Sequence, residues 1–220
     1  MTARQLPLNL PHEPSFARED FLESSANVEA LRAIEAWPNW AGRMLLLIGP
    51  AGSGKSHLGA IWARSSGATI AEAKALPQAF DAPALLVEAA DRIGAAEASL
   101  FHLINQAREA GAGVLLTARS PPDAWGLKTP DLTSRLRLAL TARLKPPDDD
   151  LARAVLFKLF ADRQLAVDPS VIAYIALRIE RSLGAARAIV EALDREGLAR
   201  GRAVTRAMAA DVLKGWAGEE

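Results

Sequence analysis

Short apolar runs alternate with stretches of helical periodicity over the first two thirds of the chain. A short run of this kind is typical of a strand that is buried on both faces of a sheet. Strands are predicted at residues 44–48, 68–71, 84–87, 114–117 and 138–144. Helices are predicted at about 28–36, 55–65 and 97–110, where apolar side chains recur at helical spacing. Strands that alternate with helices predict an α/β fold with a parallel sheet flanked by helices.

The pattern changes at residues 145–150, where two prolines precede three aspartates. Proline pairs interrupt regular structure, and aspartate favours the positive end of a following helix. Only helical patterns follow, at about 151–163, 169–181, 184–199 and 206–216. Before the first strand, prolines at positions 7, 11 and 14 predict an extended arm. We therefore expect an arm at 1–15, an α/β domain at 16–145 and a small all-α domain at 146–220.

Charge and cysteine content exclude several classes of protein. The chain has 26 basic and 26 acidic residues, so no net charge indicates a nucleic acid or a membrane as partner. Cysteine is absent, which excludes disulfides and thiolate metal sites. The longest apolar run, Met44–Ile48, is too short to cross a bilayer, and the first residues do not form a signal peptide. These features predict a soluble cytoplasmic protein.

The strongest chemical signal lies directly after the first predicted strand. Residues 49–56 match the phosphate-loop pattern G-x-x-x-x-G-K-[ST] throughout. Glycines allow successive backbone N–H groups to converge on an anion, and the start of the next helix adds its positive end. Lys55 is expected at the β- and γ-phosphates, and the Ser56 hydroxyl at Mg²⁺. The predicted nucleotide contacts are Gly49, Pro50, Ala51, Gly52, Ser53, Gly54, Lys55 and Ser56.

A second acidic group is expected where the third strand ends. ATPases of this class place a Mg²⁺-binding carboxylate there, followed by one that orients the attacking water. Glu88 is the candidate Mg²⁺ ligand, although a solvated strand end is the alternative. Ala89 and Ala90 follow it, and neither can polarise water. Asp91 comes three residues after Glu88, with no predicted place at the site. The sequence thus predicts nucleotide binding with little hydrolysis.

Several segments resemble the DnaA branch of AAA+ proteins, over about residues 14–216. Residues 16–21 and 25–27 look like its adenine-side segment, and residues 54–58 continue the phosphate loop as that family does. Residues 114–122 look like its sensor-1 strand and the turn that follows. Residues 131–136 look like the segment that carries its arginine finger. The resemblance implies an AAA+ domain with a helical lid, which binds ADP or ATP with Mg²⁺.

The resemblance also implies roles for single residues. His57 would join the nucleotide contacts, and Arg135 would be an arginine finger that acts in trans on ATP bound to a DnaA initiator. The lid arginine that senses nucleotide is assigned to Arg187, although an ungapped comparison puts Gly184 there. One departure concerns the sensor turn, where Arg119 stands at the place expected for an acid and Thr117 is the polar alternative.

The arm carries a further resemblance. Gln5, Leu6, Leu8 and Leu10 resemble the peptide with which replication proteins bind the sliding clamp (its β subunit). Alternate side chains of an extended peptide can enter apolar pockets of a partner. The chain ends at Glu220 after the lid, so no helix-turn-helix domain and no sequence-specific DNA binding are expected. The combination is similar to the Hda-type regulatory inactivators, which repress re-initiation of replication.

Other functions remain open at this stage. A helicase loader of the same branch would use the same phosphate loop on a replication helicase or single-stranded DNA. A small-molecule kinase is less consistent with an all-helical tail that lacks a second cluster of charged residues. No membrane contact is expected, and a homo-oligomer is possible.

Overall fold

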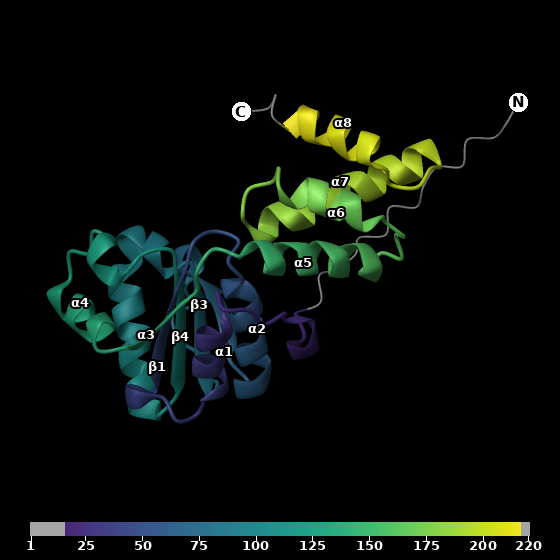
Figure 1. Ribbon diagram of the computed structural model, residues 1–220. Helices are drawn as coiled ribbons and strands as arrows, with labels where there is room; N and C mark the ends of the chain where they lie inside the picture. Colours follow the sequence, from purple (N-terminus) through teal and green to yellow (C-terminus); the bar gives the residue numbers. More distant parts are fainter. Residues whose placement is uncertain (1–15, 217–220) are drawn as a thin grey trace, which may run out of the picture. The chain divides into compact units, whose positions relative to one another are not determined.

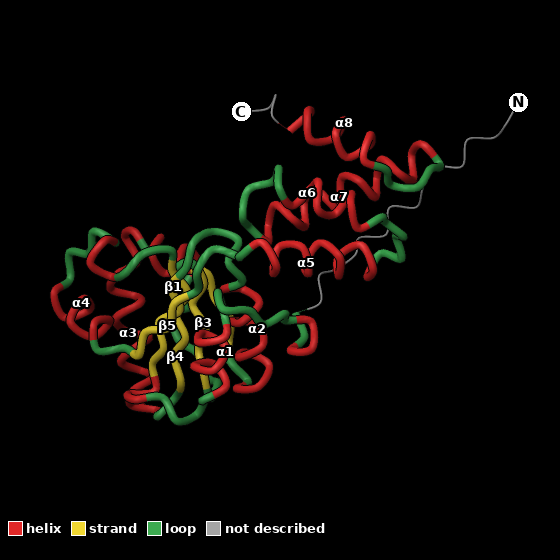
Figure 2. The backbone as a smooth tube through the Cα atoms, viewed as in Figure 1, coloured by secondary structure: helices red, strands yellow, loops and turns green. Residues whose placement is uncertain are grey.

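A single parallel sheet forms the centre of the N-terminal unit. The computed structural model describes residues 16–216. The strands of the sheet are β1 (Met44–Ile48), β2 (Thr69–Glu72), β3 (Ala84–Glu88), β4 (Gly113–Ala118) and β5 (Leu140–Arg143). They lie in the order β2-β3-β4-β1-β5, and every neighbouring pair is parallel. Figure 2 shows the strands in yellow at the centre of this unit. The predicted fold class is confirmed.

Helices cover both faces of this sheet (Figure 1). They are α1 (Val28–Glu35), α2 (Lys55–Ser66), α3 (Glu97–Ala110) and α4 (Pro130–Arg137). Successive residues of a strand face opposite sides, so β1 contributes Leu45 and Leu47 to the core under α1 and α2. Leu46 and Ile48 enter the core under α3 and α4. Buried apolar side chains on both faces explain why the strands read as continuous apolar runs.

Short 3₁₀ turns complete this unit. They are η1 (Arg18–Asp20), η2 (Ala41–Arg43), η3 (Ala73–Ala75), η4 (Ala90–Arg92), η5 (Gly94–Ala96) and η6 (Pro122–Ala124). The fifth strand starts later than predicted. Leu138 is the C-cap of α4, with helical backbone angles, and is 82% exposed, so the strand begins at Leu140. The apolar pattern cannot distinguish a leucine at a helix end from a leucine in a strand. The predicted strand therefore began at Leu138, two residues too early.

The C-terminal unit contains only helices among its described residues. They are α5 (Asp149–Asp162), α6 (Pro169–Ala176), α7 (Leu183–Arg200) and α8 (Arg206–Trp216), and they enclose their own apolar core. The chain divides into compact units at Pro146, with Phe16–Pro146 on one side and the four helices on the other. No helix between residues 16 and 216 is long and apolar enough to cross a membrane.

Side-chain caps define the starts of three of these helices. Asp148 accepts from the Leu151 N–H at 2.8 Å, and Asp168 accepts from the Ser170 N–H at 2.8 Å. Hydrogen bonding by the Ser170 side chain, together with its backbone N–H, lowers the pKa of Asp168. Ser182 accepts from the Ala185 N–H at 3.1 Å and starts α7. α6 ends earlier than predicted, at Ala176, because the following residues form the turn that leads to this cap.

Three tryptophans pack under one face of the sheet. Trp40 and Trp62 stack with their ring centroids 5.2 Å apart, and Trp37 meets both edge-on. Trp37 covers the backbone at the start of β4, where a Cβ on Gly113 would lie 2.2 Å from Trp37 Cη2. The close approach of this ring therefore requires glycine at position 113.

We predict that Gly113→Ala destabilises the N-terminal unit by about 1–3 kcal/mol, because the added methyl group must displace an aromatic ring in a packed core. The measurement is denaturant unfolding followed by circular dichroism. A Trp37→Ala background is the control, since it removes the obstructing ring. An equal cost of Gly113→Ala in both backgrounds would contradict the proposed clash.

Candidate nucleotide-binding site

The phosphate loop connects the end of β1 to the start of α2. Gly49 continues the sheet, since its N–H donates to the Ala118 carbonyl at 3.1 Å. Gly52 and Gly54 have φ of 65° and 101°, which are left-handed values that glycine adopts without strain. α2 begins at Lys55, directly after the second of these. The loop and the helix end together have the backbone geometry that an anion-binding loop requires, while the predicted nucleotide contacts stay a prediction.

Close packing beneath the loop explains its first glycine. A Cβ on Gly49 would lie 2.7 Å from Ser53 Oγ and 2.8 Å from Leu144 Cβ. Leu144, the residue after β5, thus packs closely against the loop, and a larger residue at position 49 would push the two apart. Ser53 Oγ is buried without a hydrogen-bond partner within residues 16–216.

The Lys55 ammonium folds back over this loop. It donates to the carbonyls of Gly49 and Pro50, at 2.7 Å each. Burial lowers the pKa of Lys55, and the nearby Arg119 guanidinium lowers it further. Asp91 and Glu88 act in the opposite direction on this pKa. Lys55 is therefore half-buried in a group of charged side chains. Lys55 itself follows β1, the two acids lie at or after the end of β3, and Arg119 follows β4.

These side chains line a cavity of about 300 Å³ next to the loop. β4 lies between β1 and β3, so its end stands between the phosphate loop and Glu88. The cavity is lined by Ala51, Gly52, Lys55, Ser56, Glu72, Glu88, Ala89, Asp91, Arg92, Thr117 and Arg119. Four of the predicted phosphate-loop residues thus meet Glu88 in one cavity, and Arg119 and Thr117 reach it from the sensor turn.

The turn after β3 brings one further acid into the cavity. Ala89 has left-handed backbone angles, φ 52° and ψ 44°, and its N–H donates to Thr117 Oγ1 at 3.0 Å. The 3₁₀ turn that follows returns Asp91 to the cavity wall. The sequence did not predict this place for Asp91, because a left-handed alanine has no sequence signature. Asp91 sits in the cavity beside Glu88, with no acid at position 89.

His57 holds the predicted adenine-side segment against α2. Its Nε2 lies 2.9 Å from the Ala17 carbonyl oxygen. The rings of Phe16 and Phe21 meet the imidazole edge-on, with centroids 5.4 and 5.2 Å away. Arg18 is tied down by Glu23 and Glu35, at 2.7 and 2.6 Å. His57 is therefore observed as a support for residues 16–21, and its predicted nucleotide contact stays a prediction.

Arg135 lies away from the nucleotide cavity. It belongs to α4, donates to Asn105 Oδ1 on α3, and lies over the Phe101 ring with 4.9 Å from Cζ to the centroid. It lines a second pocket of about 400 Å³, together with Arg43 and Arg108. Two contacts from α3 thus fix the orientation of Arg135 within its own domain.

Two other groups of predicted residues are not tested by this geometry. Arg187 is half-buried in α7 of the helical unit, where burial and the neighbouring Arg163 lower its pKa. Its predicted contact with the nucleotide stays a prediction. The clamp-binding residues Gln5, Leu6, Leu8 and Leu10 lie outside the described residues.

Comparison with known proteins agrees with this geometry. No family model matches the chain. It is 30% identical over 83 residues to the chromosomal replication initiator protein DnaA of Cutibacterium acnes, a match that covers 38% of this chain and 17% of the relative. Domain III of the Thermotoga maritima replication initiation protein DnaA superposes with a TM-score of 0.81 at 19% identity, covering 94% of this chain and 98% of that one. The AMPPCP-bound DnaA of Aquifex aeolicus superposes at 0.70 and 15% identity, covering 84% and 67%.

The chain therefore has the fold of an AAA+ nucleotide-binding domain. Within that class it has the fold of DnaA domain III, and the sequence match supports the DnaA-related family. Only a small part of the curated relative is matched, so its activity and partners do not transfer directly to this chain.

We predict that Lys55→Ala lowers affinity for ADP and ATP at least tenfold to a hundredfold, because each charge-assisted bond to phosphate contributes about 1.5–3 kcal/mol. Isothermal titration calorimetry measures the affinity. Lys74→Ala, at an exposed lysine of η3 outside the cavity lining, is the control and should bind as the unaltered protein does. Unchanged affinity in the Lys55 variant would exclude the loop as the binding site.

Proposed function

We propose that this chain is an adenine-nucleotide-binding AAA+ regulator of DNA replication that acts on a DnaA initiator. The observation that carries the proposal is a complete phosphate loop beside a charged cavity, in the fold of DnaA domain III. The structurally similar DnaA of Aquifex aeolicus is bound to AMPPCP, an analogue of ATP. The nucleotide is therefore ADP or ATP.

Binding exchanges one set of Lys55 partners for another. The ammonium leaves the carbonyls of Gly49 and Pro50, which it contacts at 2.7 Å, and pairs with the β- and γ-phosphates. Because both sets of bonds are charge-assisted, the ammonium stays satisfied before and after binding. The backbone N–H groups of the loop and the start of α2 hold the phosphates in place.

The donors beside the loop fit Mg²⁺ held jointly with phosphate. Ser56 and Glu88 line the same cavity, and a Cβ on Gly59 would lie 3.9 Å from Glu88 Oε1. Glu88 therefore reaches toward the first turns of α2, which carry Ser56. No cluster of three acids or histidines gathers to hold a metal within residues 16–216. Mg²⁺ needs no such cage, since it is usually bound by one or two protein oxygens plus phosphates and water.

The finer part of the proposal assigns Arg135 to the ATP site of a neighbouring DnaA molecule. Arg135 does not line the nucleotide cavity of its own domain, and Asn105 and Phe101 hold its guanidinium at the domain surface. An arginine supplied in trans stabilises charge on the transferring phosphoryl group and accelerates hydrolysis about 10³–10⁵-fold. That factor corresponds to roughly 4–7 kcal/mol. DnaA would then hydrolyse its ATP faster and lose its initiating form.

A clamp-binding arm would determine where and when this protein stimulates ATP hydrolysis by DnaA. Gln5, Leu6, Leu8 and Leu10 would dock in an apolar groove of the DNA-loaded clamp. Coupling to the clamp would restrict DnaA inactivation to replicating chromosomes, as in the Hda-type regulators that the sequence resembles. The similar solved structures named above are initiators, so a helicase loader is not favoured.

We predict that Arg135→Ala reduces stimulation of DnaA-bound ATP hydrolysis at least a hundredfold, because the partner site loses its stabilising cation. Radiolabelled ATP on purified DnaA, with clamp and DNA present, gives the rate. The variant should keep its own affinity for ADP.

Arg137→Ala is the matched control for this experiment. Arg137 is an exposed arginine of the same helix, and it pairs with Asp123. This variant should stimulate as the unaltered protein does. Full stimulation by the Arg135 variant would remove the trans role while leaving nucleotide binding intact.

A separate prediction concerns the arm. Gln5→Ala combined with Leu8→Ala should weaken binding to purified sliding clamp at least tenfold, since an anchoring amide and a buried apolar side chain are both lost. Competition with a fluorescent clamp-binding peptide measures the affinity. Asn9→Ala is the control, because position 9 lies in the same segment but is not one of the predicted clamp-binding residues. Equal competition by all three proteins would show that the arm does not bind the clamp.

A further inference from the structure

The second pocket of the N-terminal unit, of about 400 Å³, lies at the other end of the strands from the nucleotide cavity. Met44 and Val114 line it, and they are paired at the starts of β1 and β4. The nucleotide cavity is instead lined by residues at and beyond the ends of β3 and β4 and by the phosphate loop after β1. A ligand in the second pocket therefore does not need to contact the nucleotide.

The floor of this pocket is aliphatic. Ile104 and Ala107 of α3 contribute to it together with Met44 and Val114 of the sheet, and Ile104 and Val114 are buried. No aromatic ring lines the pocket within residues 16–216. Bases of single-stranded nucleic acids bind mainly by stacking on aromatic rings, so this floor suits an apolar side chain of a protein better than a base.

The charged groups of the pocket are all arginines. Arg43, Arg108 and Arg135 line it, and no acidic residue does so among the described residues. Arg43 and Arg108 are exposed, and neither forms an ion pair with an acid of residues 16–216. The neighbouring Arg137, by contrast, is paired with Asp123. Three positive charges without a balancing acid favour a ligand that brings carboxylates.

Two of these arginines are held in place before any ligand binds. Asn105 and Phe101 fix the guanidinium of Arg135. The backbone of Arg43 has a left-handed φ of 53°, and its N–H donates at 3.0 Å to the carbonyl of Trp40, a buried residue of the core. A site whose groups are already positioned loses less conformational freedom on binding.

An exposed leucine indicates that the ligand extends beyond the pocket itself. Leu138 contributes to the pocket lining, yet it is 82% exposed. Leu140, two residues further on, starts the edge strand β5 and is 41% exposed. Exposed apolar groups beside a pocket are typical of protein interaction sites. A peptide that crosses the rim would cover Leu138, whereas a small molecule within the pocket would leave most of it in water.

We propose that this pocket binds an acidic peptide segment of a partner protein. An apolar side chain of the segment enters the aliphatic floor, and carboxylates on either side of it pair with Arg43, Arg108 and Arg135. Hydrogen bonds between guanidinium and carboxylate groups are charge-assisted and can be bidentate, so they select aspartate or glutamate at these places. The inference goes beyond the proposed function, because it requires neither nucleotide nor clamp.

Three synthetic peptides with blocked ends test the chemistry of the ligand. The first, Asp-Glu-Leu-Phe-Asp-Glu, has both features, the second replaces its acids by Asn and Gln, and the third replaces Leu-Phe by Ser-Ser. Fluorescence polarisation with the 220-residue protein measures their affinities. The first peptide should bind at least tenfold more tightly than either of the others. Raising the salt concentration from about 50 to about 500 mM should weaken its binding, because salt screens the charge pairs.

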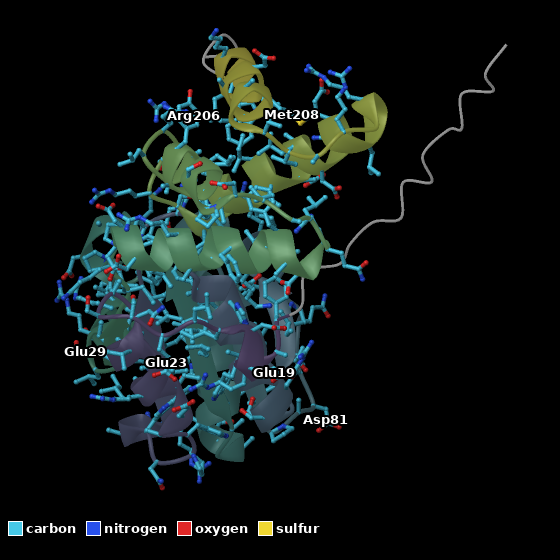
Figure 3. The ribbon with its side chains drawn as sticks, turned by 45° about the vertical axis from the view of Figure 1, so that its right-hand side comes forward. Glu19, Glu23, Glu29, Asp81, Arg206 and Met208 are labelled. Carbon is cyan, nitrogen blue, oxygen red and sulfur yellow. The ribbon has the colours of Figure 1, made fainter. Side chains whose placement is uncertain are left out.

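Variants of the pocket test where the peptide binds. Arg43→Ala combined with Arg108→Ala should weaken binding of the first peptide at least tenfold, since two charge-assisted contacts are lost. Arg135 is left unchanged in this test because the proposed function already uses it. Arg206→Ala removes an exposed arginine of the C-terminal unit (Figure 3) and should bind as the unaltered protein does.

The apolar part of the surface has its own pair of variants. Leu138→Ala should weaken binding of the first peptide about threefold, because it removes apolar surface that the peptide covers. Leu177→Ala is the control, since Leu177 is 74% exposed and belongs to the C-terminal unit. Its affinity for the peptide should be unchanged.

Several results would overturn the assignment. They are absence of binding by the first peptide, equal binding of the first and second peptides, and equal losses in the double variant and the Arg206 variant. Binding of phosphatidylserine vesicles or of oligothymidylate that is lost in the double variant, without peptide binding, would also overturn it and assign the pocket to a membrane or a nucleic acid. All these measurements are made without nucleotide, so a negative result leaves the proposed function intact.

Discussion

The site depends on the position of β4 between β1 and β3. Parallel strands end at the same edge of a sheet, and this order brings the ends of β1, β3 and β4 together there. The phosphate loop follows β1, the acids follow β3, and Thr117 with Arg119 belongs to β4 and its turn. Parallel pairing from Met44–Val114 to Ile48–Ala118 fixes where β1 ends relative to β4. A shift in this register would separate Lys55 from the side chains that surround it. The closeness of Gly49 to Leu144 adds β5 to the same arrangement.

Much of the fold was predictable because burial on both faces leaves a plain trace in the sequence. The apolar runs at residues 44–48, 84–87 and 114–116 have no polar interruption, and the phosphate loop requires particular residue types at fixed positions. Asp91 was not predictable in this way. Its place depends on a left-handed Ala89 and on a hydrogen bond to Thr117, a residue 28 positions further along the chain. The partners of Arg135 on α3 are 30 or more positions away in the sequence, so these contacts could not be predicted from it either. A pattern within a short segment predicts the structure of that segment, whereas these contacts depend on how distant segments pack together.

Glu88 and Asp91 line the same cavity although they are three residues apart, whereas related ATPases place two acids on adjacent residues. Adjacent residues at a strand end point in opposite directions, so a Mg²⁺ ligand and a water-orienting acid can reach the site together only if the backbone bends after the strand. Here the bend is the Ala89 turn, and the second acid comes three residues after the first. The different surroundings of the two acids suit different roles. Glu88 reaches along α2, whereas Asp91 keeps a buried oxygen beside the phosphate-binding lysine.

Arg119 and Arg135 differ in where they lie relative to the nucleotide cavity. Arg119 lines the cavity of its own domain, where it supplements Lys55. Arg135 lies on α4 outside that cavity, held by a neutral amide and an aromatic ring, neither of which cancels its charge. A domain that supplies its own phosphate cation does not need a neighbour to complete its site, and its surface arginine then remains available for another molecule. Nucleotide binding within the chain and the proposed contact of Arg135 with a partner are therefore compatible, because Lys55 and Arg119 line one pocket and Arg135 lines another.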